Sequence, residues 1–112
     1  MNFIGLDLGT SSLKAIMINA EQRILAEHTV SLTAQRPQTG WSEQDPEQWF
    51  TAAKTAIRAL GDVSGVRAIG MSGHMHGATF VDANDQVLRP CILWNDTRSH
   101  AEANALDADP QF

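Results

Sequence analysis

Cysteine is almost absent from this sequence, since Cys91 is the single example among 112 residues. A disulfide within the chain is therefore impossible, which fits a reducing compartment. Cys91 lies between Pro90 and Ile92, and we expect it to be a small buried apolar residue.

Long apolar runs are also missing. No stretch approaches the roughly 20 residues that a membrane-spanning helix needs. The first apolar run is interrupted by Asp7 and has no basic region before it, so it is not a signal peptide. We therefore expect a soluble cytoplasmic protein with no membrane partner.

Basic residues are scarce, with eight lysines and arginines against thirteen acidic residues and a formal net charge of −5. This balance argues against a general nucleic-acid binder, which would normally present a basic face. A phosphate ligand remains compatible with it, because a pocket needs only local donors and a metal. The length allows one domain at most, and the 43% hydrophobic content can fill a core.

The hydrophobic pattern predicts three strands at the start of the chain, over residues 2–8, 13–18 and 24–32. Short turns join them, which favours an antiparallel meander. The third strand alternates less cleanly, so we expect it to be half exposed. Residues 33–44 are expected to form a loop.

A helix is predicted after this loop. Asp45 is a good N-cap, Pro46 suits the first helical position, and Gln48 stands where a capping-box partner belongs. Gly61 is expected to end the helix. Apolar residues at helical spacing form one face of this helix: Trp49, Ala53, Ala56, Ile57 and Leu60.

The second half predicts a less regular arrangement. Residues 66–71 form a nearly continuous apolar run, which suggests a strand buried on both faces. The order of elements indicates an α/β protein with a mixed sheet. The remaining predicted segments are a loop at 72–77, strands at 78–81, 87–88 and 91–94, and a helix at 97–106.

The end of the first strand has the layout of a metal–phosphate site. Asp7 is an acid that a core would not accept without a partner or a cation. Gly9 lets the backbone turn and approach a ligand, and the hydroxyls and N–H groups of residues 10–12 suit an anion. The same residues also fit an ordinary hairpin turn, with Asp7 and Thr10 bonded to local backbone.

A second polar stretch follows the strand at 66–71. Ligands collect where strands end in open α/β sheets. His76 could hydrogen-bond to a sugar-like hydroxyl, and Met75 could form an apolar wall. A solvated turn is the plain alternative. A metal site at His74 and His76 has less in its favour, because no second pair of ligands lies nearby in the sequence.

A third polar stretch combines an amide, a carboxylate and a guanidinium in Asn95, Asp96 and Arg98. These side chains could form a polyol-binding edge. Taken alone, the stretch favours Asp96 as the cap of the following helix and Arg98 as one half of a surface ion pair. In an earlier stretch, Trp41 is expected to be a packing anchor and Glu43 to be solvated.

Four stretches together resemble the N-terminal part of the FGGY family of carbohydrate kinases, and within it the xylulose kinases. Met75-His76-Gly77 is similar to the xylulose kinase pattern and unlike the Arg-Glu pair of glycerol kinases. The stretches are I-G-L-D-L-G-T-S-S-L-K at 4–14, W-S-E-Q-D-P-E-Q-W at 41–49, G-M-S-G-H-M-H-G at 70–77 and L-R-P-C-I-L-W-N-D-T-R at 88–98.

The resemblance implies a ribonuclease-H-like, actin-like fold that opens in a three-stranded antiparallel meander. It implies transfer of the γ-phosphoryl group of ATP to D-xylulose, with Mg²⁺ as the metal. Asp7 would be the catalytic carboxylate beside the metal. The implied phosphate-binding residues are Gly9, Thr10, Ser11, Ser12 and Lys14, and the implied sugar contacts are Met75, His76, Trp94, Asp96 and Arg98.

Two departures from the family pattern matter. His74 stands where most members carry Gln, which would change the preferred sugar rather than the reaction. Members are also several times longer, and a second domain supplies their catalytic base and adenine site. We therefore expect residues 1–112 to be an incomplete first domain, inactive alone and part of a longer polypeptide or held by a partner chain.

The resemblance is compatible with a homodimer of the full-length protein. Two alternative functions also remain at this point: a kinase for another sugar of the same family, and a fragment that binds sugar or phosphate without catalysis.

Overall fold

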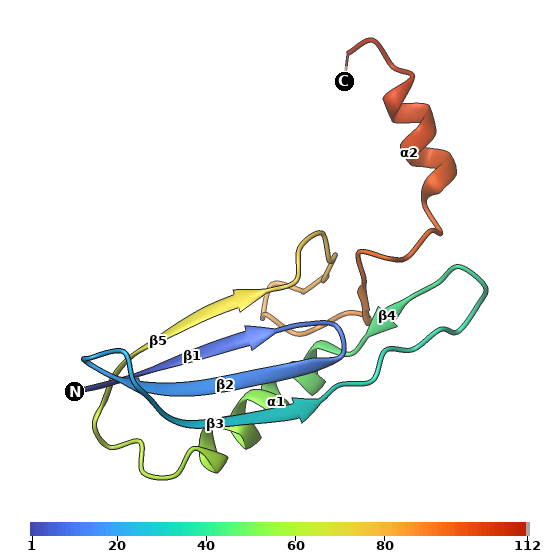
Figure 1. The fold of residues 1–112 in the computed structure, drawn as a ribbon. Coiled ribbons are helices and arrows are strands. Elements are labelled where there is room, and N and C mark those ends of the chain that lie inside the picture. Colours follow the sequence, from blue (N-terminus) through green and yellow to red (C-terminus); the bar gives the residue numbers. More distant parts are fainter. Residues whose placement is uncertain (112) are drawn as a thin grey trace.

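The computed structural model describes residues 1–111. Its main body is a four-stranded sheet in the order β3-β2-β1-β5 with one helix, α1, along one face (Figure 1). The antiparallel pairing of β1, β2 and β3 confirms the predicted meander, and the parallel pairing of β5 with β1 makes the sheet mixed. The strands are β1 (Asn2–Leu8), β2 (Ser12–Asn19), β3 (Ile24–Ser31) and β5 (Val66–Gly73).

The core lies between the sheet and α1 (Pro46–Ala59). Alternation along β1 and β2 turns every second side chain toward the helix. Ala52 and Ala56 are the buried residues of α1, and their small side chains let the helix lie close to the sheet. The strand residues buried beneath the helix are Ile4, Leu6, Leu13, Ala15 and Met17.

The start of α1 follows the prediction only in part. Asp45 is the N-cap, since its Oδ1 accepts from the Glu47 N–H at 3.0 Å. Gln48 does not complete a capping box. Its side chain accepts from the Thr33 N–H at 2.6 Å and donates to the Thr33 carbonyl at 3.3 Å, because the segment after β3 runs beside the first helical turn. Gly61 has a φ of 92° and follows the helix, as expected.

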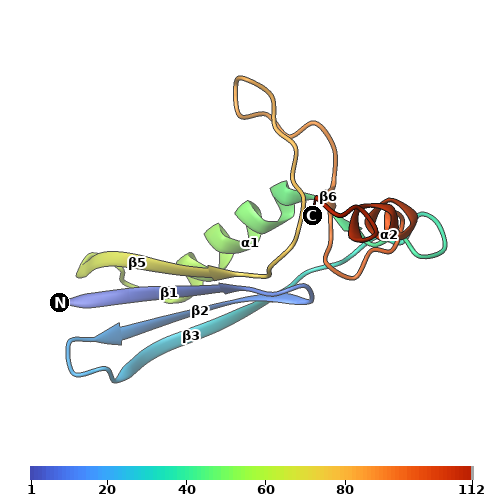
Figure 2. The same ribbon diagram turned by 90° about the horizontal axis from the view of Figure 1, so that it is seen from above.

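The expectation that residues 66–71 are buried on both faces is wrong. Every residue of β5 except Val66 is exposed, and Met71 is 75% exposed. Within residues 1–111, β5 is an edge strand that pairs only with β1 (Figure 2), and the contacts of α1 with the sheet are mainly to β2 and β3. The other edge strand, β3, was expected to be half exposed and is more exposed than that, since only Ala26 and Val30 are partly buried.

After β5 the chain leaves the sheet. The strands expected at 78–81 and 87–88 appear only as single bridges, Ala78 to Ile92 and Val81 to Val87. A second, two-stranded sheet pairs β4 (Glu43–Gln44) with β6 (Cys91–Ile92). Sequence reasoning assigned β4 to a loop, because a two-residue strand has no readable period. Cys91 is 1% exposed, which confirms its expected burial.

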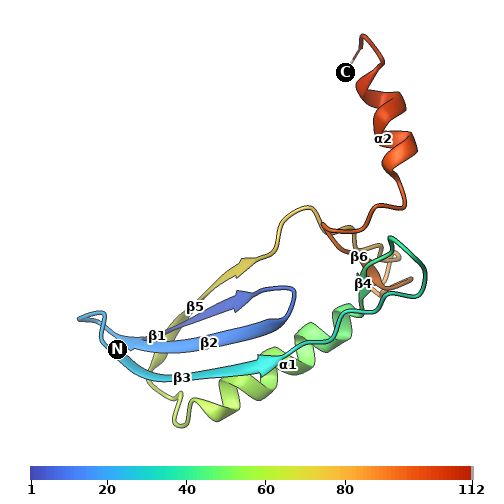
Figure 3. The same cartoon turned by 45° about the vertical axis from the view of Figure 1, so that its right-hand side comes forward.

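The last helix, α2 (His100–Asp107), begins later than predicted and has no buried residue. It projects away from the sheet (Figures 1 and 3), and the described chain measures 52 × 30 × 29 Å. None of the helices in residues 1–111 has the length and apolar character required to cross a membrane.

Candidate active site at the carboxyl ends of β1 and β5

The first two polar stretches noted in the sequence begin at one end of the sheet, and Trp94, directly before the third, reaches it. Because β1 and β5 are parallel, their carboxyl ends lie side by side, and the turn at 9–12 and the loop at 74–77 begin there (Figure 1). Trp94 reaches the same place, where its Nε1 donates to Thr10 Oγ1 at 3.2 Å. This is the edge at which open α/β sheets bind ligands.

Asp7 lies near the end of β1 with an exposed side chain. Its Oδ1 accepts from Ser72 Oγ at 2.8 Å, across the parallel pairing with β5. The partner is 65 positions away, so the side chain does not form the local bonds that the plain hairpin interpretation requires. Asp7 Oδ2 has no hydrogen bond among the described residues and can accept a cation.

The ligands near Asp7 suit Mg²⁺, which protein side chains hold only in part, better than a metal that needs a full set of protein ligands. No group of three His, Cys, Asp or Glu side chains that could hold a metal occurs in residues 1–111, so His74 and His76 gain no support as a metal pair. Mg²⁺ is usually bound through one or two carboxylates together with substrate phosphates. A single exposed carboxylate beside an anion-binding turn matches that mode.

The turn at 9–12 is tight. The Gly9 N–H donates to the Ser12 carbonyl at 2.9 Å, and a Cβ at position 9 would lie 3.3 Å from that same oxygen. The carbonyl of Ser11 accepts from the Leu32 N–H at 2.8 Å, which ties the turn to the end of β3. The Ser11 side chain is exposed, so the turn presents a hydroxyl and backbone N–H groups to a ligand.

Lys14 lies on β2 directly opposite Asp7, and paired residues share one face of a sheet. Its Nζ is 3.6 Å from Glu27 Oε2, and both side chains are about half exposed. Asp7, Lys14, Glu27 and Ser72 line a hollow of about 530 Å³ on the face opposite α1. Lys14 therefore contributes positive charge to the same hollow as Asp7.

The loop at 74–77 presents His76 in an unusual backbone conformation, with a φ of 61°. Residues other than glycine rarely adopt a positive φ, and such strain concentrates at functional sites. A Cβ at Gly77 would lie 3.1 Å from Cys91 Sγ, so any other residue there would push the loop and β6 apart by a few tenths of an ångström. Met75 and His76 are both exposed beside this anchor.

His74 lies behind the exposed loop residues. Its ring meets the Trp49 indole edge-on, with centroids 5.2 Å apart. Both ring nitrogens are buried and have no hydrogen-bond partner among residues 1–111. A buried polar group without a partner is costly, so this position is available to a ligand, a water molecule or another protein group.

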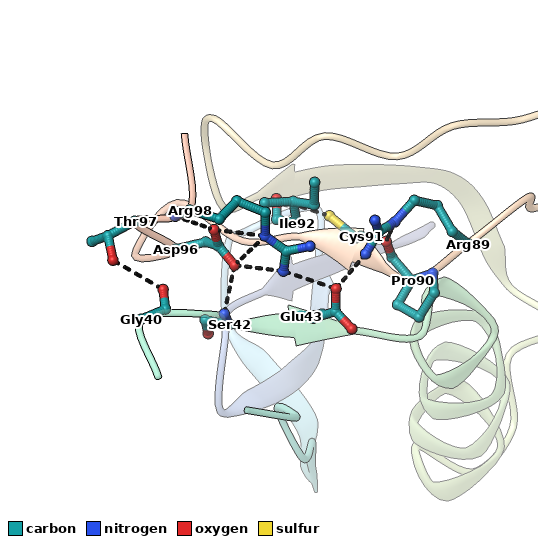
Figure 4. A network of polar contacts seen from close by, with 10 residues as sticks. All are labelled: Gly40, Ser42, Glu43, Arg89, Pro90, Cys91, Ile92, Asp96, Thr97 and Arg98. Atoms are coloured by element: carbon teal, nitrogen blue, oxygen red, sulfur yellow. Dashed lines mark hydrogen bonds and ion pairs between the residues drawn. The ribbon is translucent and has the colours of Figure 1, made fainter. Parts of the chain in front are cut away.

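Asp96 and Arg98 form a buried charged network with Glu43 (Figure 4). Arg98 Nη2 is 2.7 Å from Asp96 Oδ2 and 2.8 Å from Glu43 Oε2. Asp96 Oδ2 also accepts from the Ser42 N–H at 2.6 Å. The side chains of Asp96, Glu43 and Arg98 are 1%, 10% and 12% exposed, and Arg89 completes the network with a second bond to Glu43.

Three expectations for this region are wrong. Asp96 does not cap α2, whose N-cap is Ser99, because its carboxylate binds the Arg98 guanidinium instead. Arg98 does not form a surface ion pair, since both of its partners are buried. Glu43 is not solvated, because two arginines bind it. Trp41 packs as expected, with the Arg98 guanidinium 3.7 Å above its ring centroid.

The network has an electrostatic consequence. Hydrogen bonds from Arg98 hold the pKa of the Asp96 carboxyl well below its usual range, with the Ser42 N–H adding to the effect. The same hydrogen bonds, which Asp96 accepts, raise the pKa of Arg98. Asp96 and Arg98 therefore stay charged at neutral pH. The network ties β4 to the segment around Trp94.

Comparison with known proteins identifies the family. The sequence model of the FGGY family of carbohydrate kinases, N-terminal domain, matches residues 2–111. The chain belongs to this family. The xylulose kinase of Escherichia coli K12 is 50% identical over 109 residues, which cover 95% of this chain and 22% of that protein. The xylulose kinase of Klebsiella pneumoniae is 51% identical over 108 residues, covering 94% of this chain and 22% of that protein.

Solved structures support the same assignment. A protein described as a xyloylose kinase from Brucella ovis superposes with a TM-score of 0.95 at 53% identity, covering 99% of this chain and 24% of that one. The chain thus has the ribonuclease-H-like, actin-like fold of FGGY kinases, which confirms the predicted fold class. It spans about a fifth to a quarter of the length of these relatives.

Within this FGGY domain, sequence reasoning missed Gln44. The side chain is 0% exposed, its Nε2 donates to the Thr10 carbonyl at 3.0 Å, and its Oε1 accepts from Trp49 Nε1 at 2.6 Å. In the stretch from Trp41 to Pro46, the sequence predicts roles for Trp41, Glu43, Asp45 and Pro46 and none for Gln44. A signal was present, because a glutamine directly before an N-cap is well placed to reach back into the core.

Proposed function

We propose that this chain is the phosphate- and sugar-binding N-terminal part of an ATP-dependent xylulose kinase, which converts D-xylulose to D-xylulose 5-phosphate. The observation that carries the proposal is the meeting of Asp7, the turn at 9–12 and the loop at 74–77 at one sheet edge. It is supported by the 50% identity to a xylulose kinase.

In this proposal, the turn at 9–12 holds the phosphates of ATP through its N–H groups and hydroxyls, and Asp7 holds Mg²⁺. When bound, Mg²⁺ supplies positive charge that offsets the charge of the phosphates. Lys14 adds positive charge on the same face as Asp7. Phosphoryl transfer is catalysed chiefly by positioning and charge neutralisation, so these groups suit the reaction.

The sugar lies against the loop at 74–77 in the same proposal. Met75 and Trp94 are 66% and 57% exposed and offer apolar surface to the C–H groups of a sugar. His76 offers a ring nitrogen to a hydroxyl. Asp96 and Arg98 lie behind Trp94 with side chains that are 1% and 12% exposed, so in this proposal they border the sugar site and hold Trp94 in place.

The catalytic base lies outside residues 1–111 in this proposal. A general base must lie within hydrogen-bond reach of the hydroxyl proton. Asp7 is assigned to the metal, and Asp96 is engaged by Arg98 and the Ser42 N–H. We therefore expect that residues 1–112 alone do not catalyse phosphoryl transfer to the sugar.

The activity can be tested in a chimeric kinase, made of residues 1–111 joined to the remaining part of the E. coli xylulose kinase. We expect ADP release that depends on D-xylulose, with kcat/KM about tenfold or more above that for ribulose, fuculose or gluconate. Residues 1–112 without the remaining part serve as the negative control. A folded chimera that binds D-xylulose but releases no ADP would contradict the proposal and favour a non-catalytic binding role.

A kinase for another sugar is the second candidate. The observation that favours it is His74, which departs from the Gln that the family resemblance implies and has two buried ring nitrogens without a partner among residues 1–111. The same sugar panel separates the two candidates, because a higher kcat/KM for another sugar than for D-xylulose would select the second.

A further inference from the structure

Thr10, at the tip of the β1–β2 turn, is held by side chains from two distant segments. Gln44 Nε2 donates to its carbonyl oxygen at 3.0 Å, and Trp94 Nε1 donates to its Oγ1 at 3.2 Å. Turn tips are ordinarily among the more mobile and tolerant parts of a fold. Two long-range hydrogen bonds at this tip indicate that its conformation matters for more than closing the hairpin.

Only one orientation of the Gln44 side-chain amide, with Oε1 toward Trp49 and Nε2 toward Thr10, satisfies both of its partners. Trp49 Nε1 donates to its Oε1, and an indole N–H cannot accept a hydrogen bond. The Thr10 carbonyl at the other end cannot donate one. With the side chain 0% exposed, both ends must be bonded for the amide to be buried without a large cost. Gln44 is therefore a rigid link from α1 to the turn.

This link orients the next N–H group. The Thr10 carbonyl and the Ser11 N–H belong to one peptide unit, and no cis peptide bond occurs in the described chain. In a planar trans peptide, the C=O and N–H groups point in opposite directions. Since the Thr10 oxygen is drawn toward buried Gln44, the Ser11 N–H points away from it, and no protein group within residues 1–111 accepts its hydrogen bond.

We propose that Gln44 is a positioning residue that fixes the plane of the Thr10–Ser11 peptide, so that the Ser11 N–H faces the phosphoryl group to be transferred. The inference rests on the proposed function, which takes the turn at 9–12 as the phosphate site. Gln44 touches no substrate and acts only through Thr10. A donor that is already oriented stabilises developing charge without reorganisation during the reaction.

The test is the substitution Gln44→Met in the chimeric kinase, which keeps the volume and removes both hydrogen bonds. We expect kcat/KM for Mg·ATP to fall about 10- to 100-fold, as is usual when a supporting hydrogen bond is lost or a reacting group is misplaced. The KM for D-xylulose should stay within about twofold, because the sugar loop keeps its own anchor at Gly77 and Cys91.

Gln48→Met is the matched control. Gln48 also binds a loop through its side-chain amide, at Thr33, which follows Leu32, the residue whose N–H donates to the Ser11 carbonyl. Gln48 itself makes no hydrogen bond to the turn at 9–12. Both substitutions should lower the melting temperature, and only Gln44→Met should change the Mg·ATP parameters. Equal Mg·ATP parameters in the unmodified, Gln44→Met and Gln48→Met proteins would overturn the proposal. If Gln44→Met does not fold, Trp49→Phe removes the anchoring N–H and should shift the same parameters less.

Binding of a non-hydrolysable ATP analogue with Mg²⁺, measured by calorimetry, keeps the two proposals apart. An unmodified chimera that neither binds the analogue nor releases ADP contradicts the proposed function. The same result contradicts the proposed role of Gln44, which depends on that function. An active unmodified chimera whose Gln44→Met variant matches it in both binding and kcat contradicts the role of Gln44 alone.

Discussion

Replacing Arg98 with methionine is expected to lower the melting temperature of the chimeric kinase by about 3–5 °C. Methionine fills the space over Trp41 but leaves the carboxylates of Asp96 and Glu43 buried without the guanidinium that binds them both. Breaking a buried ion pair by removing one partner costs far more than the pair itself contributes. Thermal unfolding followed by circular dichroism measures the change.

Two comparisons make this expectation specific. Arg67→Met removes an exposed arginine from β5 and should change the melting temperature by only about 1–2 °C. The triple variant Glu43→Gln, Asp96→Asn, Arg98→Met removes the buried charges together and should be more stable than Arg98→Met alone. Equal melting temperatures for Arg98→Met and Arg67→Met would contradict the described network.

The same network predicts a pH dependence. Arg98 depresses the pKa of Asp96 below its unfolded value of about 3.9, so the stabilisation is complete above that pH and is lost as the pH falls toward the folded pKa. The melting-temperature difference between the unmodified protein and Arg98→Met should therefore be constant from about pH 5 to pH 8 and shrink below about pH 4.

Replacing Asp7 with asparagine is expected to lower kcat of the chimeric kinase about 10²- to 10³-fold, the range for losing one electrostatic contact at a reacting centre. Asparagine keeps an oxygen that can accept from Ser72 Oγ and removes the negative charge proposed to hold Mg²⁺. Steady-state kinetics at varied Mg²⁺ should show a weaker response to the metal, with the KM for D-xylulose nearly unchanged.

Ser72→Ala is the control for Asp7→Asn. It removes the side-chain hydrogen bond from Ser72 Oγ to Asp7 Oδ1 and leaves the carboxylate in place. We expect a loss of kcat of about tenfold or less. If the two substitutions reduced kcat equally, the hydrogen bond rather than the charge of Asp7 would be the important feature, and the proposed metal role would be wrong.

The features that sequence predicted well are local ones. The turn at 9–12 is confirmed as a tight turn between two strands, because a strand end, a glycine and three hydroxyls lie within a few residues. Its phosphate-binding role stays a prediction. The meander follows from alternation over single strands. Asp45 and Gly61 act within one helical turn of the ends of α1, where capping rules apply.

The features that sequence missed depend on partners far along the chain. Glu43 is buried because Arg89 and Arg98 bind it from 46 and 55 positions away. Gln44 reaches Thr10 across 34 positions. The exposure of β5 depends on which elements lie beside it rather than on its own composition, so the apolar run at 66–71 was misleading.

The central claim is that Asp7 and the turn at 9–12 hold the metal and the phosphates while the loop at 74–77 meets the sugar. A crystal structure of the chimeric kinase with Mg²⁺, a non-hydrolysable ATP analogue and D-xylulose tests it most directly. We predict the metal beside the Asp7 carboxylate, the terminal phosphate against the Ser11 N–H, and the sugar against Met75 and His76. Phosphates bound away from the turn at 9–12, with the metal held by other carboxylates, would contradict the account.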